Sequence, residues 1–398
     1  MSTGIEDLED RSFDPHVADD LMFGTVEDPF TPLAVLRSIA PVVKVEGPAP
    51  PGYANAFTVV SYAAVEQVMN DPTTFSSRPL RELLANYGPL LSGMDPPGHA
   101  PYRKVLQKVF RPAVVQQWGD DIVAPVIDGL VEGFSATGRA ELVEEFCRPF
   151  PFEVICRLLR LPAEDIDVFY RLTMAQIATL NAGEASEKLA RYFTRLVRDR
   201  SAEPGDDLIS AVATAEIDGE PIPHDVVISF LLQLMSAAGE TTFRSMSVLL
   251  TGLLIHGEHL DAIRADRDLV PQAIEEALRW DGPVLTTPRS TTRDVVLDGV
   301  PVPANSVLNV SLGAANRDPA VFSSPDEFDI FRDRHRHFGF AFGAHNCLGQ
   351  QLARIEINRA MNALLDALPG LRLDPGEPVP RLRGVSMRTP RRLHVLFD

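Results

Sequence analysis

Cysteine and basic residues are both scarce in this sequence. Its 398 residues include three cysteines, Cys147, Cys156 and Cys347, which are too few and too scattered to form a disulfide framework. Lysine and arginine total 37 against 55 acidic residues, so the formal net charge of −18 makes nucleic acid an unfavourable partner. A disulfide-stapled secreted domain and a nucleic-acid-binding protein are therefore both disfavoured.

Long apolar runs and targeting segments are missing as well. No apolar run reaches the roughly 18 residues that a membrane helix needs. The opening residues, MSTGIEDLEDRSFD, are acidic and lack the basic-then-apolar order of a secretory signal. We find no repeats, low-complexity tracts or linkers either. We therefore expect a cytoplasmic protein without membrane insertion, folded as a single domain over residues 1–398.

The patterns that are present are mostly helical. Hydrophobic residues make up 45% of the chain and charged residues 23%, an ordinary globular balance. Helical periodicity dominates residues 114–213. The longest helical pattern, 225–256, contains the uncharged stretch FLLQLMSAAG, which indicates a buried helix. Short strand patterns follow in VVLDGVPVP and SVLNVSL. The predicted fold class is mainly α with minor β-sheets.

One stretch near the C-terminus, residues 337–354, has the sequence HFGFAFGAHNCLGQQLAR. Aromatic residues and glycines lead to Cys347, after which an apolar period indicates a helix. Backbone N–H groups at a helix N-terminus favour a thiolate. Gly343 and Gly349 would let such groups approach the sulfur, as around metal-bound cysteines. A lone cysteine is otherwise most often a small buried hydrophobic residue.

This stretch resembles the cysteine ligand loop of the cytochromes P450, the thiolate-ligated haem monooxygenases. Ala341 stands where glycine is usual, and five residues match the family pattern: Phe340, Gly343, His345, Cys347 and Gly349. The order of predicted elements is similar to the family fold over nearly the whole chain. The resemblance implies a cytochrome P450 domain that binds haem b (iron protoporphyrin IX), with Cys347 as the metal ligand and the other matching residues around the cofactor.

A second motif, AAGETT at residues 237–242, lies within the long helical pattern. A buried carboxylate needs a partner. Glu240 could pair with Arg244 one turn further on, while a threonine hydroxyl returns to the helix backbone. In the other interpretation, a threonine hydroxyl leaves the helix and holds water together with the acid. The motif resembles the family's oxygen-activation signature, which implies catalytic roles for Glu240 and Thr241 and places Ala238 beside the haem.

Basic residues at four positions resemble the family's partners of the haem propionates. His99 and Arg103 are one turn apart in DPPGHAPYRK, Arg289 lies in PVLTTPRST, and His345 precedes the cysteine. Partly buried carboxylates need such cationic or hydrogen-bonding partners. Any one of the four alone would be read as an ordinary surface charge.

Glu276 and Arg279 lie three residues apart in a predicted helix, so their side chains can meet. The pair resembles the family's Glu-x-x-Arg element, which implies a structural role beneath the cysteine loop. The family element has a third, basic member in the irregular segment that follows. Glu327 stands where many relatives carry arginine, so Arg332 is the candidate for that place.

The resemblance implies a haem-thiolate monooxygenase that inserts one oxygen atom from O2 into a C–H bond of a small apolar organic substrate. A peroxide-driven variant and a haem-binding sensor or carrier without turnover stay open as alternatives. A cysteine-nucleophile hydrolase is a third, although His345 is poorly placed as its base. We expect an apolar substrate pocket lined by six residues: Leu90, Met94, Ala237, Leu285, Thr286 and Met387.

No flavin or iron–sulfur segment is recognisable, so electrons must come from another protein. The resemblance implies a ferredoxin and a ferredoxin reductase, which pass on electrons from NAD(P)H. Lys104, Lys108 and Arg111 would share one face of a helix that begins near His99, because they are spaced at i, i+4 and i+7. We expect this face to attract an acidic ferredoxin. An ordinary solvated helix face is the alternative.

Overall fold

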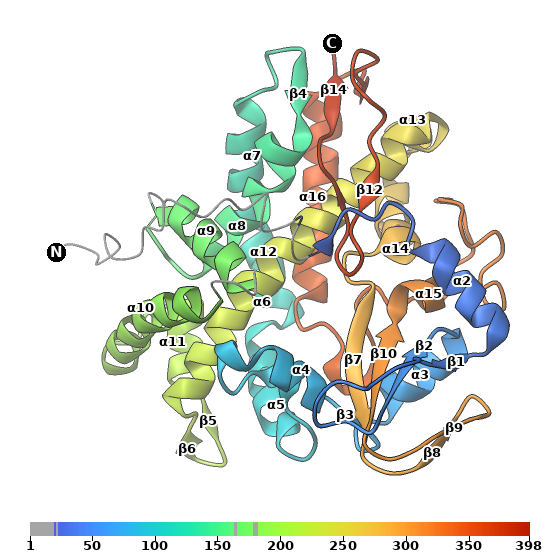
Figure 1. The fold of residues 1–398 in the computed structure, drawn as a ribbon. Coiled ribbons are helices and arrows are strands. Elements are labelled where there is room, and N and C mark those ends of the chain that lie inside the picture. The colour runs from blue at the N-terminus through green and yellow to red at the C-terminus, as the bar shows by residue number, and fades with distance from the viewer. Residues whose placement is uncertain (1–19, 21–22, 163–164, 178–181) are drawn as a thin grey trace.

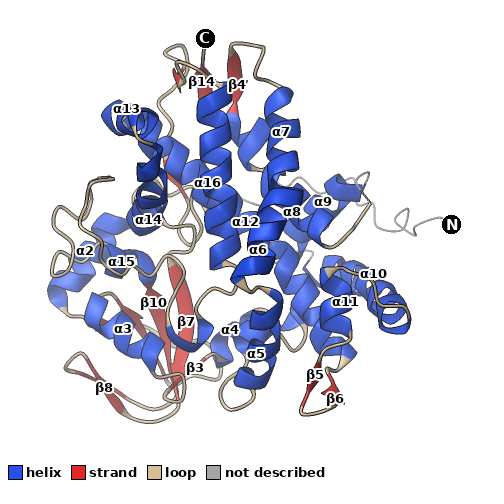
Figure 2. Ribbon diagram, turned by 180° about the vertical axis from the view of Figure 1, so that it is seen from behind, coloured by secondary structure: helices blue, strands red, loops and turns tan. Residues whose placement is uncertain are grey.

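The computed structural model describes residues 20, 23–162, 165–177 and 182–398. Helices form most of this part of the chain, and the largest sheet lies at one side of it (Figures 1 and 2). This confirms the predicted fold class, mainly α with minor β-sheets. The α-helices are α2 (Phe30–Ile39), α3 (Tyr62–Asn70), α4 (Arg78–Leu83), α5 (His99–Val109), α6 (Pro112–Trp118), α7 (Ala124–Glu132), α8 (Pro149–Leu158), α9 (Ile166–Ile177), α10 (Ala182–Ala202), α11 (Leu208–Ala213), α12 (His224–Ile255), α13 (Gly257–Ala265), α14 (Val270–Asp281), α15 (Leu312–Asn316) and α16 (Gln350–Ala367).

Helix α12 crosses the molecule from one end to the other (Figure 1). Its 32 residues span about 48 Å at the usual rise of an α-helix. By length and composition it would also suit a membrane, which corrects the expectation that no apolar stretch is long enough. In the structure, however, 56% of its apolar window is buried inside the protein. Helices α8, α10, α14 and α16 pack against it, so α12 is the central helix of the core.

The largest sheet of the described residues has the strand order β1–β2–β10–β7–β3. Strand β10 pairs in parallel with β2 and antiparallel with β7. Apolar side chains of this sheet form a second core cluster with α3. The sheet thereby fixes β7, which carries Arg289. The strands are β1 (Val42–Lys44), β2 (Asn55–Val59), β3 (Phe75–Ser76), β4 (Arg139–Glu141), β5 (Glu216–Ile217), β6 (Glu220–Pro221), β7 (Thr286–Thr291), β8 (Val295–Leu297), β9 (Val300–Val302), β10 (Ser306–Ser311), β11 (Arg372–Leu373), β12 (Leu382–Arg383), β13 (Thr389–Pro390) and β14 (His394–Leu396).

An ion network on α14 holds the irregular segment between α15 and the cysteine loop. Arg279 binds Glu276 through two hydrogen bonds of 2.7 Å. It also donates to three backbone carbonyl oxygens beyond its own helix. Arg332 is the third member that the sequence left open, because its Nε lies 3.2 Å from Glu276 Oε1. Glu327 takes part through its backbone carbonyl.

Candidate functional site

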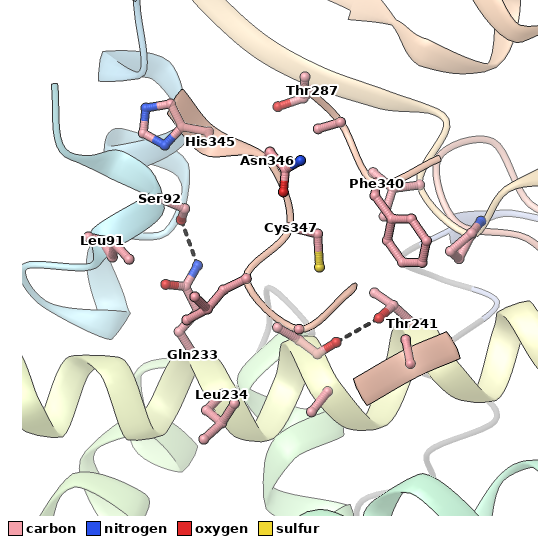
Figure 3. Close-up of a pocket in the computed structure, with 18 of the residues that line it drawn as sticks. Leu91, Ser92, Gln233, Leu234, Thr241, Thr287, Phe340, His345, Asn346 and Cys347 are labelled. Carbon is pink, nitrogen blue, oxygen red and sulfur yellow. Dashed lines mark hydrogen bonds between the residues drawn. The ribbon is translucent and has the colours of Figure 1, made fainter. Parts of the chain in front are cut away.

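A cavity of about 320 Å³ lies beside the middle of α12, and we call it the central cavity. Its wall combines one face of α12 with the cysteine loop, β7 and the start of α16. Figure 3 shows the Cys347 side chain directed from the loop toward α12, with Phe340 and Thr287 on the same side of the cavity. Residues that are more than a hundred positions apart in the sequence therefore meet in one apolar space.

The cysteine loop is held by a backbone hydrogen bond and by a required glycine. The Cys347 N–H donates to the carbonyl of Phe340 at 2.9 Å. Gly343 has φ +71°, and a Cβ there would lie 2.1 Å from the carbonyl oxygen of Met69, so a side chain does not fit. Ala341, where the family pattern has glycine, adopts φ +54°. This left-handed backbone is costly for alanine and is maintained by the surrounding loop.

Cys347 differs from the other two cysteines in its surroundings. Cys147 and Cys156 lie in the apolar core, where burial raises the pKa of each thiol to about 12. Burial also raises the pKa of Cys347, but the backbone N–H groups of Gly349 and Gln350 oppose that rise. Cys347 is thus the cysteine that faces a cavity and has hydrogen-bond donors for a thiolate.

Four basic side chains line the central cavity together: His99 and Arg103 from α5, Arg289 from β7, and His345 from the cysteine loop. The rings of His99 and His345 are 4.4 Å apart between centroids. Arg103 donates to the carbonyl of Asn346 at 2.6 Å, which connects α5 to the residue before the cysteine. The structure brings together all four residues that the sequence predicts as partners of the propionates.

Among the described residues, Arg103 and Arg289 of this cluster donate to carbonyl and hydroxyl oxygens and to no carboxylate. Burial lowers the pKa of Arg289 to about 10, and burial with the neighbouring cations lowers that of His345 to about 3. Asp95, whose charge acts on Arg289, is paired with Arg81 instead. Arg103 Nε is buried and has no hydrogen-bond partner in the part of the chain that the structure describes. Buried cations of this kind require anions, and two carboxylates such as the haem propionates would supply them.

The space beside the cysteine also suits a flat cofactor. Gly349 lines the central cavity at the start of α16, and a Cβ built there would meet no atom within 4 Å. Glycine at this position would let a flat cofactor lie directly against the backbone of residue 349. Ala238 on α12 and Phe340 on the cysteine loop line the same cavity. The residues present therefore fit haem b.

Three hydroxyl groups of α12 line the central cavity, and they differ in their hydrogen bonds. Thr241 Oγ1 donates to the carbonyl of Ala237 at 2.7 Å, and Ser245 Oγ donates to the carbonyl of Thr241 at 2.7 Å. Both hydroxyl groups therefore bond to backbone carbonyl oxygens of α12, and α12 is one continuous α-helix. Thr242 Oγ1 instead donates to Glu356 on α16 at 3.1 Å. Thr242 is therefore the residue of the three whose hydroxyl group bonds to a different helix.

Glu240 is not among the residues that line the central cavity. Its carboxylate is 1% exposed, and its Oε2 lies 2.7 Å from Arg244 Nε, which is the structural alternative that the sequence left open. Successive residues of an α-helix point about 100° apart, so Glu240 and Thr241 do not face the same point. The predicted acid–alcohol pair is not assembled at the cavity, and a catalytic role of Glu240 stays a prediction.

Of the six residues predicted to line a substrate pocket, one lines the central cavity and three others are sequence neighbours of residues that do. Ala237 lines the central cavity, whereas Met94 and Met387 do not. Neighbouring residues of an extended chain point to opposite faces. When one residue faces the cavity, the residue next to it in the sequence therefore points away from the cavity. The lining residue is the neighbour of the predicted one at three places: Leu91 instead of Leu90, Val284 instead of Leu285, and Thr287 instead of Thr286.

The sequence did not predict four polar residues that line the central cavity: Ser92, Gln233, Ser245 and Glu356. Gln233 Nε2 donates to Ser92 Oγ at 2.6 Å across the cavity wall (Figure 3). Glu356 lies on α16 and is 3% exposed. One signal was available for Glu356, because Leu352 and Ala360 at i−4 and i+4 place it on the apolar face of its helix. No motif marks Gln233 or Ser92.

The site now defines a class of protein. A cavity-facing cysteine at a helix N-terminus, a buried cluster of two arginines and two histidines, and a long central helix together describe a haem-thiolate protein of mainly α fold. Comparison with known proteins agrees with this class. The Cytochrome P450 family model matches residues 181–394.

Two curated relatives and one solved structure extend the match over most of the chain. Cytochrome P450 monooxygenase PikC from Streptomyces venezuelae is 35% identical over 377 residues, which cover 90% of each chain. Mycinamicin IV hydroxylase/epoxidase from Micromonospora griseorubida is 33% identical, over 91% of this chain and 94% of the relative. The structure of CYP109E1 from Bacillus megaterium in complex with testosterone has a TM-score of 0.84 at 27% identity, covering 93% of this chain and 99% of that chain. The chain belongs to the cytochrome P450 family and is a haem-dependent monooxygenase.

Proposed function

We propose that this cytochrome P450 inserts one oxygen atom from O2 into a C–H bond of a small, neutral, apolar substrate, with Cys347 as the haem ligand. The observation that carries the proposal is the convergence of Cys347, the four basic residues and the hydroxyl groups of α12 on one cavity. Bound haem supplies the activation of O2, which electron donation from a thiolate ligand favours.

The protein's own residues would bind, orient and protect the reacting groups. The guanidinium groups of Arg103 and Arg289 and the rings of His99 and His345 would hold the two propionates and thereby fix the cofactor's orientation. Thr241 presents Oγ1 to the cavity, where this oxygen can accept a hydrogen bond from water. Apolar side chains in the rest of the wall exclude other water from the reaction.

The wall also indicates the kind of substrate. Gln233 and Ser92 form a neutral polar site in an otherwise apolar part of the cavity, and none of the described residues donates to the side-chain carbonyl oxygen of Gln233. Gln233 precedes Thr241 by eight residues, or about 12 Å along the helix. These features favour an apolar molecule with a neutral hydrogen-bonding group at roughly that distance from the oxidised carbon. Testosterone, the ligand of the similar CYP109E1, has this character.

Electrons would come from NAD(P)H through a ferredoxin reductase and a ferredoxin in the cytoplasm. Lys104 and Lys108 are exposed on α5, the helix that carries Arg103 into the cavity wall. Arg111 is exposed as well but lies beyond the end of α5, because it precedes Pro112 and takes an extended backbone with ψ 148°. The proposed docking face therefore rests on the two lysines, with Arg111 beside them rather than on the same helix.

A labelling experiment tests the proposed function. Apolar compounds are first screened for binding by the low-spin to high-spin shift that they cause in the haem spectrum. Each compound that binds is then incubated under 18O2 with the purified protein, a ferredoxin, a ferredoxin reductase and NAD(P)H. The proposal predicts one 18O atom in the product and no label when the experiment uses H218O and unlabelled O2. Turnover with peroxide alone would instead support the peroxide-driven variant. Ligand binding without any oxidised product would support a sensor or carrier.

A further inference from the structure

An ion pair between α14 and α16 contacts the cysteine loop through both of its members. Arg354 Nε lies 2.7 Å from Glu275 Oε1, and Arg354 Nη2 lies 3.0 Å from Glu275 Oε2. Glu275 Oε2 is also 3.0 Å from Nε2 of His337, at the start of the loop. The guanidinium carbon of Arg354 lies 4.4 Å from the centre of the Phe340 ring. We call Glu275, Arg354 and His337 the loop triad.

The loop triad is hydrogen-bonded to both ends of the cysteine loop. At the start of the loop, the Gly339 N–H donates to Nδ1 of the triad histidine at 3.1 Å, so this ring is neutral and donates from Nε2 to the carboxylate. At the other end, the triad arginine donates to the side chain of Gln350 at 3.0 Å, and that side chain donates to Asn346 at 2.8 Å. Because Gly339 and Asn346 both line the central cavity, the hydrogen bonds reach it on both sides of Cys347 in the sequence.

The loop triad holds one negative and one positive charge. Burial by itself would raise the pKa of Glu275, but hydrogen bonds from His337 and Arg354 outweigh burial and lower this pKa to about 2. Glu275 is therefore an anion at neutral pH. Burial raises the pKa of the Cys347 thiol, and the positive charges of Arg103 and Arg354 are among the effects that oppose the rise. The charge of Arg354 thus acts on Cys347, and the carboxylate of Glu275 offsets part of it.

We propose that Glu275, acting through Arg354, sets the reduction potential of the haem that Cys347 binds. The inference rests on the proposed ligation of haem by Cys347. Net charge and hydrogen bonding around a metal centre shift its potential, and a positive charge favours the reduced state because that state carries one more electron. Loss of the Glu275 carboxylate would leave the Arg354 charge uncompensated and raise the potential. Loss of the Arg354 charge would lower it. Both are positioning residues.

The alternative is that the ion pair only fastens α14 to α16. The side chains of Arg354 and Glu275 are 31% and 37% exposed, and ion pairs of this exposure contribute little to stability. The two roles differ in the sign of their effects. A loosened cysteine loop would shift the potential in the same direction whichever partner is removed, whereas loss of one charge or the other shifts it in opposite directions.

Redox titration of the haem-loaded protein, followed in the Soret band, tests the proposal. We expect the potential of Glu275→Gln to rise and that of Arg354→Gln to fall, each changing the ratio of reduced to oxidised haem by roughly threefold or more at a fixed applied potential. A tenfold change would correspond to about 59 mV for one electron. Arg354→Lys keeps the charge and should stay close to the wild type. Both shifts should shrink between about 0.01 M and about 1 M salt, because the screening length falls from about 30 Å to about 3 Å.

Arg267→Gln and Asp366→Asn are the matched controls on the same helix. Arg267 lies 3.1 Å from Asp366 near the C-terminal end of α16, and their side chains are 34% and 76% exposed. Asp366 follows Arg354 by 12 residues, or about 18 Å along the helix. Charges at that distance are screened from the haem site, so both controls should keep the wild-type potential.

The spectrum with carbon monoxide separates failure of this inference from failure of the proposed function. If the wild type shows the red-shifted Soret band of thiolate ligation, equal potentials in all variants, or shifts of the same sign in Glu275→Gln and Arg354→Gln, would overturn the inference alone. Should Glu275→Gln not bind haem, Arg354→Gln and Arg354→Lys test the same charge, and equal potentials of these two would overturn it. A wild type without the band would refute ligation by Cys347 and this inference with it.

Discussion

Replacing Arg279 by methionine should destabilise the protein far more than removing a surface arginine. Arg279 is 3% exposed and makes five hydrogen bonds, two to Glu276 and three to backbone carbonyl oxygens. Methionine keeps much of the volume but leaves the Glu276 carboxylate without its main partner. Breaking a buried ion pair in this way costs about 3–5 kcal/mol. Arg332, 3.2 Å from Glu276, compensates in part, so we expect the lower end of that range.

The assay is urea unfolding of the haem-loaded protein, followed by circular dichroism, with a matched control. Arg171→Met removes the exposed i,i+4 pair with Asp167, whose side chains are 42% and 75% exposed, and should cost less than about 1 kcal/mol. The Soret spectrum records whether the cysteine loop still binds haem in each variant. Equal losses of unfolding free energy in Arg279→Met and Arg171→Met would refute the assignment of Arg279 as the support of the irregular segment between α15 and the cysteine loop.

Three further predictions address the cavity, the docking face and the pH dependence of stability. Thr241→Ala should keep haem and substrate binding but divert more NAD(P)H electrons to peroxide, because water near the reaction loses its partner; unchanged coupling would make Thr241 structural. Lys104→Glu with Lys108→Glu should slow reduction by ferredoxin and flatten its dependence on ionic strength, and wild-type rates at low salt would remove α5 from the docking site. Because the folded protein holds the Glu356 proton with a pKa of about 8 against an ordinary 4.5, stability should fall as pH rises through this window, by roughly 5 kcal/mol in all. Glu356→Gln should show a flatter dependence in urea unfolding at pH 5 and pH 8, and equal slopes would contradict the raised pKa.

The fold was predictable where a single segment carries its own signal. The apolar run of α12 and the glycine-rich approach to Cys347 are local patterns, and both predict the observed elements. The end of α5 was also readable, because Pro112 keeps Arg111 out of a continuing helix. The i, i+4 and i+7 spacing of Lys104, Lys108 and Arg111 predicts a longer helix than α5, which ends at Val109.

The site was predictable only in part, because side-chain direction depends on packing. Residues 284–287 lie in an extended segment, and the sequence does not say which of its alternating faces meets the cavity. Adjacent residues of a helix point about 100° apart, so Thr241 lines the central cavity and Glu240 does not. The Thr242–Glu356 contact joins α12 to α16, and neither residue alone has a motif that predicts it.

The proposed function depends above all on the ligation of haem by Cys347 in the central cavity. The most direct measurement is the absorption spectrum of the reduced protein with carbon monoxide, recorded for the wild type and for Cys347→Ala, with Cys147→Ala and Cys156→Ala as buried-cysteine controls. We predict the red-shifted Soret band of thiolate ligation in the wild type and in both controls, and its loss in Cys347→Ala. A band that survives in Cys347→Ala, or that disappears in either control while haem stays bound, would contradict the account.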